Sequence, residues 1–169
     1  MACNSIKSFT YEACDSNLGG IKNVWLANYK ENCATLTEDT ETPSIQSFDE
    51  SVEWIHYPMR KNVASMTSTL NTSADGAVYV STELAMVFSK METQKRVAVM
   101  ALALGECMAI VEDSNGVKWF LGYDAPLTAT AGTGETGTAK GDRNAYTVTL
   151  TDESAQMPYA ISGEVTLTK

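Results

Sequence analysis

Basic residues are scarce in this chain. Its 169 residues include 12 Lys and Arg against 21 Asp and Glu, which gives a formal net charge of −9 and a pI near 4.5. A protein that grips nucleic acid needs clustered Lys or Arg to neutralise phosphates, and the only adjacent basic pairs are Arg60-Lys61 and Lys95-Arg96. An anionic membrane surface would also repel the chain. The charge therefore argues against both kinds of partner.

Long apolar runs and metal-binding cysteine patterns are also missing. The longest apolar run, 97–104, is less than half of the roughly 20 residues that span a bilayer. The first residues lack the basic start and apolar stretch of a secretory signal. The four cysteines include no C-x-x-C pair, and the single histidine, His56, has no cysteine nearby. We therefore expect free thiols, no bound metal and no cofactor.

Catalytic patterns are absent as well. A cysteine or serine nucleophile normally needs a base, and His56 lies between aromatic residues, where a hydrogen-bonded structural role is the simpler interpretation. No G-x-S-x-G motif occurs. Residues 132–137 match G-x-G-x-x-G, but no helix is expected after them, so we interpret them as a surface loop. The sequence predicts that the protein is not an enzyme.

What is present is mainly strand patterning. Short alternating or apolar segments separated by turn residues predict a β-sandwich or β-barrel of antiparallel strands with one flanking helix. The expected strands cover residues 21–29, 63–72, 77–88, 107–111, 117–121, 146–150 and 161–167. Asn115 and Gly116 form the pair that tolerates positive φ in a tight hairpin turn.

One helix is expected over residues 93–104. Thr93 can serve as its N-cap and Gly105 as its stop. An apolar stripe with helical spacing predicts how this helix packs. The stripe consists of Val97, Met100, Ala101 and Leu104.

Two segments do not fit a compact sandwich. Residues 1–20 form a polar N-terminal arm ahead of a single β domain over 21–169, and residues 31–56 form an extended loop. An arm of this kind either reaches a neighbouring subunit or is a mobile tail. The loop contains no Lys or Arg, and a loop this long is usually functional or disordered. Its seven carboxylates are Glu31, Glu38, Asp39, Glu41, Asp49, Glu50 and Glu53.

Between residues 63 and 161, several motifs follow one another in an order that indicates a family resemblance. A Ser/Thr-rich strand (63–70) precedes a turn at Asp75-Gly76, and a long strand ends at 87–90 before the helix. The hairpin at 110–119 is followed by Phe120-Leu121-Gly122, then by the segments 136–142 and 144–149 and by Pro158-Tyr159. This order resembles that of phage major tail tube proteins, particularly those of phages and prophages of Bacteroides-type hosts.

The resemblance implies a virion structural protein that is made in the bacterial host cytoplasm. In such proteins, β-sandwich subunits form rings, usually hexameric, that stack into a tube around a tape-measure protein and later carry DNA. Tail terminator and baseplate proteins are the further partners that it implies. An acidic or neutral lumen would let DNA pass without holding it. The acidic loop would then be the contact between stacked rings, or alternatively a solvated outer loop.

Two other functions remain open from the residues. A carbohydrate-binding or adhesin module would use exposed aromatic side chains to stack on sugars. The candidates are Trp54, Tyr57, Trp119 and Tyr123. Another virion part of similar fold, such as a tail terminator or a head-decoration protein, would differ from a tube protein only in how its copies assemble.

Overall fold

Two antiparallel sheets, a small hairpin and one helix form the structure. It is a computed structural model that describes residues 9, 17–39, 41–60, 63–165 and 167. The strands are β1 Ile21–Asn28, β2 Ala34–Leu36, β3 Ile45–Phe48, β4 Ile55–Tyr57, β5 Ala64–Thr72, β6 Val78–Ser89, β7 Cys107–Asp113, β8 Lys118–Leu121, β9 Thr128–Glu135, β10 Ala145–Ser154 and β11 Tyr159–Ala160. The predicted antiparallel β fold with one helix is confirmed.

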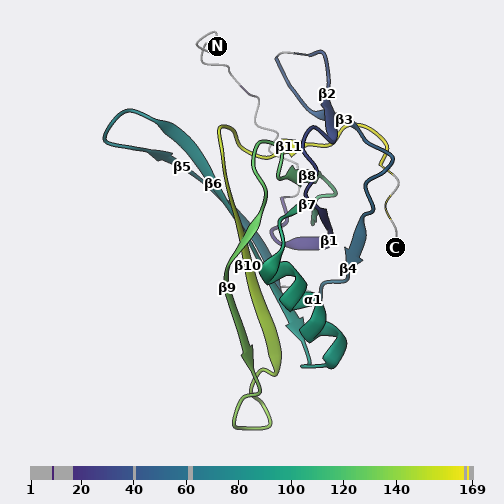
Figure 1. Ribbon diagram of the computed structural model, residues 1–169, viewed down its shortest axis with the longest axis vertical. Coiled ribbons are helices and arrows are strands. Elements are labelled where there is room, and N and C mark those ends of the chain that lie inside the picture. The colour runs from purple at the N-terminus through teal and green to yellow at the C-terminus, as the bar shows by residue number, and fades with distance from the viewer. Residues whose placement is uncertain (1–8, 10–16, 40, 61–62, 166, 168–169) are drawn as a thin grey trace.

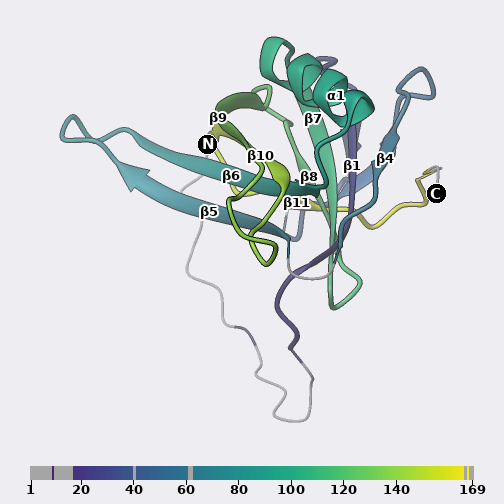
Figure 2. The ribbon, with the colours of Figure 1, turned by 90° about the horizontal axis from the view of Figure 1, so that it is seen from below.

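The strands divide into three groups (Figures 1 and 2). A five-stranded sheet has the order β11-β8-β7-β1-β4, and a four-stranded sheet has the order β5-β6-β10-β9. The hairpin β2-β3 forms a separate two-stranded sheet. All strand pairs are antiparallel. The β5–β6 hairpin projects beyond the body of the molecule, and its tip lies far from α1.

The main core lies between the two larger sheets. Its side chains come from β1 and β7 on one side and from β6 and β10 on the other, which is the arrangement of a β-sandwich. The fully buried members are Val24, Leu84, Met86, Ala109, Leu127 and Leu150.

A second core covers the opposite face of the five-stranded sheet. Trp25 and Ala27 of β1 point into it, whereas Val24 and Leu26 of the same strand point into the main core. The strands β1 and β7 are therefore buried on both faces, which explains why their sequences are apolar without alternation. The second core also contains Cys33, Ile45, Trp54, Met108, Ile110 and Phe120.

The acidic segment is thus more ordered than the sequence predicted. We expected an extended loop over 31–56, but β2 and β3 lie within it and β4 begins at its end. Ile45 is fully buried and Trp54 is 6% exposed, and both pack on the five-stranded sheet. Burial of these apolar side chains anchors the segment, and the few apolar residues among its polar ones gave too weak a signal for a strand.

The single helix, α1, spans Thr93–Leu104, as the sequence predicted. The capping differs, because Glu92 is the N-cap residue and makes no side-chain capping bond, while Gly105 closes the helix with a hydrogen bond to the Ala101 carbonyl. Within the described part of the chain, no helix is long and apolar enough to cross a membrane.

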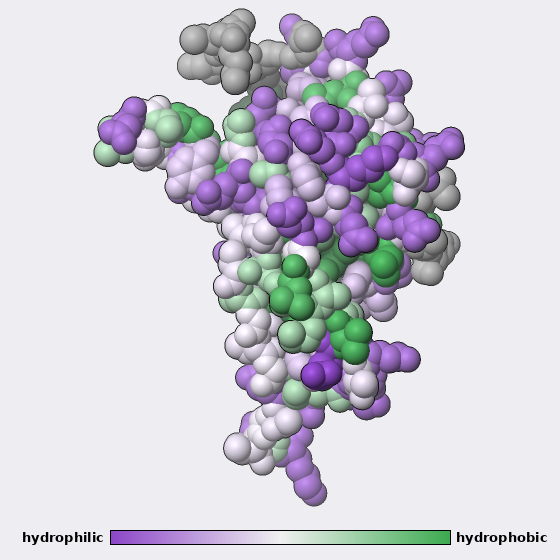
Figure 3. Space-filling view, viewed as in Figure 1, coloured by the Kyte–Doolittle hydropathy of each residue, from purple (hydrophilic) through white to green (hydrophobic). Residues whose placement is uncertain are grey.

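The side of α1 that packs inward also differs from the prediction. Leu102 is its one buried residue, and Val99 packs against the main core. The predicted stripe instead faces outward, since Val97, Met100 and Leu104 are 58%, 48% and 84% exposed. Figure 3 shows apolar side chains at the surface in the region of α1.

The predicted hairpin turn between β7 and β8 is present, with a different geometry. Gly116 has φ +90°, but Asn115 is not among the residues with positive φ. The Asp113 carboxylate accepts hydrogen bonds from the Asn115 and Val117 amides, both at 2.9 Å, and closes the turn. Asn115 instead uses its side chain, whose oxygen accepts a hydrogen bond from the Leu18 amide at 2.8 Å.

The same turn holds the end of the predicted N-terminal arm. The Ser114 amide and hydroxyl both donate to the Gly20 carbonyl at 3.0 Å. Most of the arm lies outside the described residues, and so do Cys3 and Cys14. The described cysteines, Cys33 and Cys107, are buried free thiols, as expected.

Candidate functional site

The outward face of the four-stranded sheet is polar. Along β5, β6 and β10, alternate side chains point away from the core, and strand register places them beside one another. This face carries Ser65, Thr67, Thr69, Ser81, Glu83, Thr147, Thr149, Thr151 and Glu153, with Ala85 and Val87 as its apolar members. We call this set the polar sheet face.

Positive charge is missing from this sheet. No residue of β5, β6, β9 or β10 is Lys or Arg, whereas Glu83 and Glu153 are exposed on the polar sheet face. The hydroxyls partly bond to one another, as between Thr130 of β9 and Thr151 at 2.9 Å. The face is therefore polar and weakly acidic, although the Thr147 hydroxyl is buried without a hydrogen-bond partner among the described residues, and its strands supply no cationic side chain that would pair with a phosphate.

The same sheet ends in two open edges. β5 and β9 are its outer strands, and within the described residues neither has a strand partner on its outer side. The Val87 amide donates to the Val63 carbonyl at 3.0 Å. Because hydrogen-bonded pairs alternate along an antiparallel ladder, Ala64 and every second residue after it direct their backbone groups toward the open edge of β5. Such an edge can bind another strand.

The seven predicted acidic residues do not form a single site. All are exposed, and they lie in three places: Glu38, Asp39 and Glu41 at the tip of the β2–β3 hairpin, Asp49, Glu50 and Glu53 after β3, and Glu31 before β2. At the tip, the Asp39 carboxylate accepts hydrogen bonds from the Glu41 amide at 2.8 Å and from the Thr42 hydroxyl at 2.5 Å.

One of these acids already has a basic partner within the chain. Lys30 Nζ lies 2.5 Å from the Asp49 carboxylate and 2.7 Å from the Ser51 hydroxyl. The hydrogen bond from Lys30 and those from Ser51 hold the pKa of Asp49 well below its usual range. We expected the acidic segment to form the contact between stacked rings, and Asp49 already forms an ion pair within its own chain.

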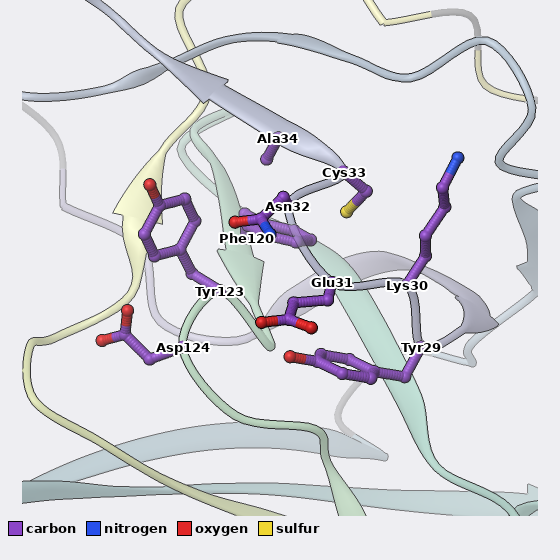
Figure 4. Close-up of a pocket in the computed structure, with 9 residues that line it drawn as sticks. All are labelled: Tyr29, Lys30, Glu31, Asn32, Cys33, Ala34, Phe120, Tyr123 and Asp124. Atoms are coloured by element: carbon purple, nitrogen blue, oxygen red, sulfur yellow. The ribbon is translucent and has the colours of Figure 1, made fainter.

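A polar pocket of about 170 Å³ opens beside this segment (Figure 4). The Glu31 carboxylate and the Tyr29 hydroxyl lie near each other there, and the Lys30 side chain points away. Burial, and then the negative charge of Glu31, raise the pKa of Tyr29. Tyr123 and Asp124 line the opposite wall.

The four aromatic candidates for sugar binding do not share one surface. Trp54 is buried in the second core, and Tyr57 packs against the main core. Trp119 donates its indole N–H to the Asp113 carboxylate at 3.2 Å. Tyr123 alone lines the pocket, where its ring lies against Tyr159 with the ring centroids 5.1 Å apart.

Buried titratable groups of two kinds lie in the protein interior: the carboxyl of Asp152 and the thiols of Cys107 in the main core and Cys33 in the second core. Burial raises the pKa of the Asp152 carboxyl, whereas hydrogen bonds from the Gly122 backbone and from Thr82 lower it. Asp152 Oδ1 has no hydrogen-bond partner within the described residues. Burial also raises the pKa of Cys33, and it raises that of Cys107 to about 11. At neutral pH these thiols are protonated and poor nucleophiles.

The histidine has the structural role that its neighbours predicted. His56 Nε2 lies 3.1 Å from Asn23 Oδ1, and its ring lies beside Trp25 with the centroids 5.3 Å apart. Asn23 in turn donates to Glu112 at 2.6 Å. Within the described ranges, no three His, Cys, Asp or Glu side chains are placed to hold a metal ion.

Sequence reasoning missed β9. Residues 132–137 were interpreted as a surface loop, yet residues 132–135 belong to this edge strand, which pairs with β10. The alternation Thr128-Ala129-Thr130-Ala131 was the available signal, but the glycines that follow it pointed to a loop.

Comparison with protein-family models, with curated proteins and with solved structures found no match for the chain.

Proposed function

We propose that this chain is the protomer of a phage tail tube, a virion structural protein whose copies form stacked rings around a channel for DNA. The observation that carries the proposal is the four-stranded sheet, which combines two open edges with a polar face free of basic residues. The resemblance of the sequence to tail tube proteins is a second support for the proposal.

The strand order suits a closed ring. The four strands alternate in direction, so β5 and β9 run antiparallel to each other at the two ends of the sheet. When identical copies join head to tail, β9 of one therefore meets β5 of the next in antiparallel orientation. Ring closure pairs both edges of this sheet, which removes the aggregation hazard of its open edges, and a large barrel of this kind encloses a channel.

In this arrangement the polar sheet face lines the channel, because the other face of the sheet is covered by the core. DNA needs such a wall to be neutral or acidic, since clustered Lys or Arg would bind phosphates by releasing counterions. Hydroxyls and the carboxylates of Glu83 and Glu153 keep the wall hydrated without attracting DNA. The protein would thus surround DNA and make no specific contact with it.

The two ends of the molecule suit stacking. The acidic β2–β3 hairpin and the turn between β9 and β10 lie at opposite ends of the long axis (Figure 1). Lys140 and Arg143 lie in that turn, and Lys90 is joined to it by a hydrogen bond to the Asn144 carbonyl at 2.7 Å. We assign the hairpin tip, with Glu38, to the contact between rings. Tape-measure, tail terminator and baseplate proteins would be further partners, as the resemblance implies.

Electron microscopy of the purified protein tests the proposal, with two alanine-to-proline variants as probes. The unsubstituted chain should form rings and tubes. Ala64→Pro removes an amide from the open edge of β5 at the first residue of the strand, where proline is tolerated, and should leave folded monomers. Ala74→Pro is the matched control, because proline suits the Ser73–Gly76 turn and both edges stay intact.

The outcomes separate the alternatives. A strict monomer at high concentration would refute the proposed function, and rings formed by Ala64→Pro as readily as by the unsubstituted chain would refute the edge junction. Rings that never stack would favour the tail terminator or decoration role.

A carbohydrate-binding module is the second candidate, and the pocket of Figure 4 is the observation that favours it. The tyrosines and carboxylates there match the groups that bind sugars in proteins. Glycan binding by the monomer that is lost in Tyr123→Ala would support this function instead.

A further inference from the structure

The outward stripe of α1 is an unusual surface for a helix. Three large apolar residues, Val97, Met100 and Leu104, lie at helical spacing and face solvent. Leu102 is the single buried residue of the helix. Single exposed apolar residues are common on proteins, but an apolar stripe along a helix usually marks a contact surface.

Met100 of the stripe also lines a groove that opens at the edge of the four-stranded sheet. This groove of about 410 Å³ lies between α1 and β9. Val99, Met100 and Ala103 form its helix wall, and small residues of β9, such as Ala129 and Gly134, form its floor. β9 is the last strand of its sheet. A further strand that paired with β9 would therefore lie next to the groove and would be covered by α1.

The opposite edge of the same sheet offers apolar residues that suit this groove. On β5, Ala64, Met66 and Leu70 share the face that is turned toward the core side. Ala64 and Met66 are half-buried, and Leu70 is 60% exposed, although it lies in a regular strand. Between them, Ser65, Thr67 and Thr69 belong to the polar sheet face and would stay in the channel, whereas Ser68 shares the core-side face and lies 3.0 Å from the Thr82 hydroxyl.

We infer that the groove between α1 and β9 receives β5 of a second copy of this chain, so that α1 covers the junction between neighbouring subunits. The inference rests on the proposed function, which joins β9 of one subunit to β5 of the next. A strand added to β9 lies about 4.8 Å beyond it, and its core-side residues, such as Met66, then face the groove that Met100 lines. The contact is heterologous: each copy gives β5 on one side and α1 on the other.

Charge in the stripe tests this contact without changing either strand edge. Met100→Glu and Leu104→Glu place a carboxylate in a junction that would become buried, which costs far more than the exposed surface of the monomer would. Both variants should remain folded, with unchanged circular dichroism, and should lose at least tenfold in ring yield. Met157→Glu is the control, because Met157 is similarly exposed, at 53%, and lies between β10 and β11.

Crosslinking identifies the partner strand directly. Two chains, Met66→Cys and Met100→Cys, are each made with Cys3 and Cys14 replaced by serine. The remaining Cys33 and Cys107 are buried. A short bis-maleimide reagent should then link the two chains when they are mixed under assembly conditions, and it should give little dimer with either chain alone, because the contact is heterologous.

The results distinguish this inference from the function on which it rests. If the unsubstituted chain forms rings that Ala64→Pro abolishes, while both glutamate variants still assemble and the mixture gives no crosslink, the covering role of α1 is refuted and the tube function stands. If the unsubstituted chain forms no rings at all, the tube function fails, and this inference fails with it.

Discussion

Gly122 lies at a point where the chain leaves β8 and where a side chain has no room. Its φ is +96°, and a Cβ built on it would lie 2.9 Å from the Cβ of Met108, which is fully buried. The backbone of Gly122 also supplies one of the hydrogen bonds to the buried Asp152 carboxyl. This glycine therefore fixes the route of the chain over the main core.

We expect Gly122→Ala to lower the free energy of unfolding by about 2–4 kcal/mol, from positive φ and from overpacking against Met108. Gly76→Ala is the matched control: φ is +84° there, and nothing lies within 4 Å of the new Cβ. It should cost only about 1 kcal/mol. Urea denaturation of the unassembled proteins measures both, and equal losses would show that contact with Met108 has no effect.

At Asn115, the sequence predicted the turn but not the contact that the side chain makes. The pair Asn115-Gly116 correctly indicated a turn, because glycine supplies the positive φ. The hydrogen bond from the Leu18 amide to the Asn115 side chain joins residues 97 positions apart. Local turn preference contains no information about such a distant contact, and so the anchoring of the arm was not foreseen.

At the scale of elements, α1 was predicted in its bounds but not in its orientation. N-terminal and C-terminal signals are local, and they located Thr93–Leu104 correctly. The apolar stripe was the natural choice for the buried side, yet Val99 and Leu102 pack on the core. Periodicity shows that a helix has an apolar face, but it does not show whether that face meets its own core or another chain.

The orientation of α1 gives a paired prediction. Leu102→Ala should lower the free energy of unfolding of the monomer by about 3 kcal/mol, because it leaves a cavity in the core. Leu104→Ala changes a side chain that is 84% exposed and should stay within about 0.5 kcal/mol of the unsubstituted chain. Thermal or urea unfolding below the assembly concentration compares them, and the reverse order would mean that the stripe packs inward.

The sequence predicted only part of the four-stranded sheet that carries the polar sheet face. The Ser/Thr-rich segment at 63–72 was predicted as a strand, and it forms β5. β9 was missed because Gly132 and Gly134 weaken the strand signal, and its pairing with β10 is a tertiary effect. The alternation of one strand thus indicated the chemistry of this face, while the extent of the face depends on which strands become neighbours.

At the scale of the whole molecule, the excess acidic residues lie in separate places. The carboxylates at the tip of the β2–β3 hairpin lie at one end of the long axis, whereas Glu83 and Glu153 lie on the polar sheet face. A net charge of −9 alone could not separate these groups. The sheet does so, because it combines acidic residues with a complete lack of basic ones along four adjacent strands.

Reversing one charge on the polar sheet face tests whether this face lines the proposed channel. Glu83→Lys should assemble normally, since Glu83 points away from the core, and should place a ring of positive charge around the lumen. Its tubes should retain short duplex DNA at low salt and release it as salt rises, because binding depends on counterion release. Co-sedimentation of DNA with tubes across a salt series measures this.

The control variant has the same net charge as Glu83→Lys, but its lysine lies at another place in the molecule. Glu164→Lys changes an exposed residue of the C-terminal segment, outside the four-stranded sheet. Its tubes, like the unsubstituted ones, should leave DNA in the supernatant at every salt concentration. If Glu164→Lys retained as much DNA as Glu83→Lys, total charge would account for binding and the polar sheet face would not be the channel wall. A difference confined to Glu83→Lys would place the DNA against β6 and its neighbours.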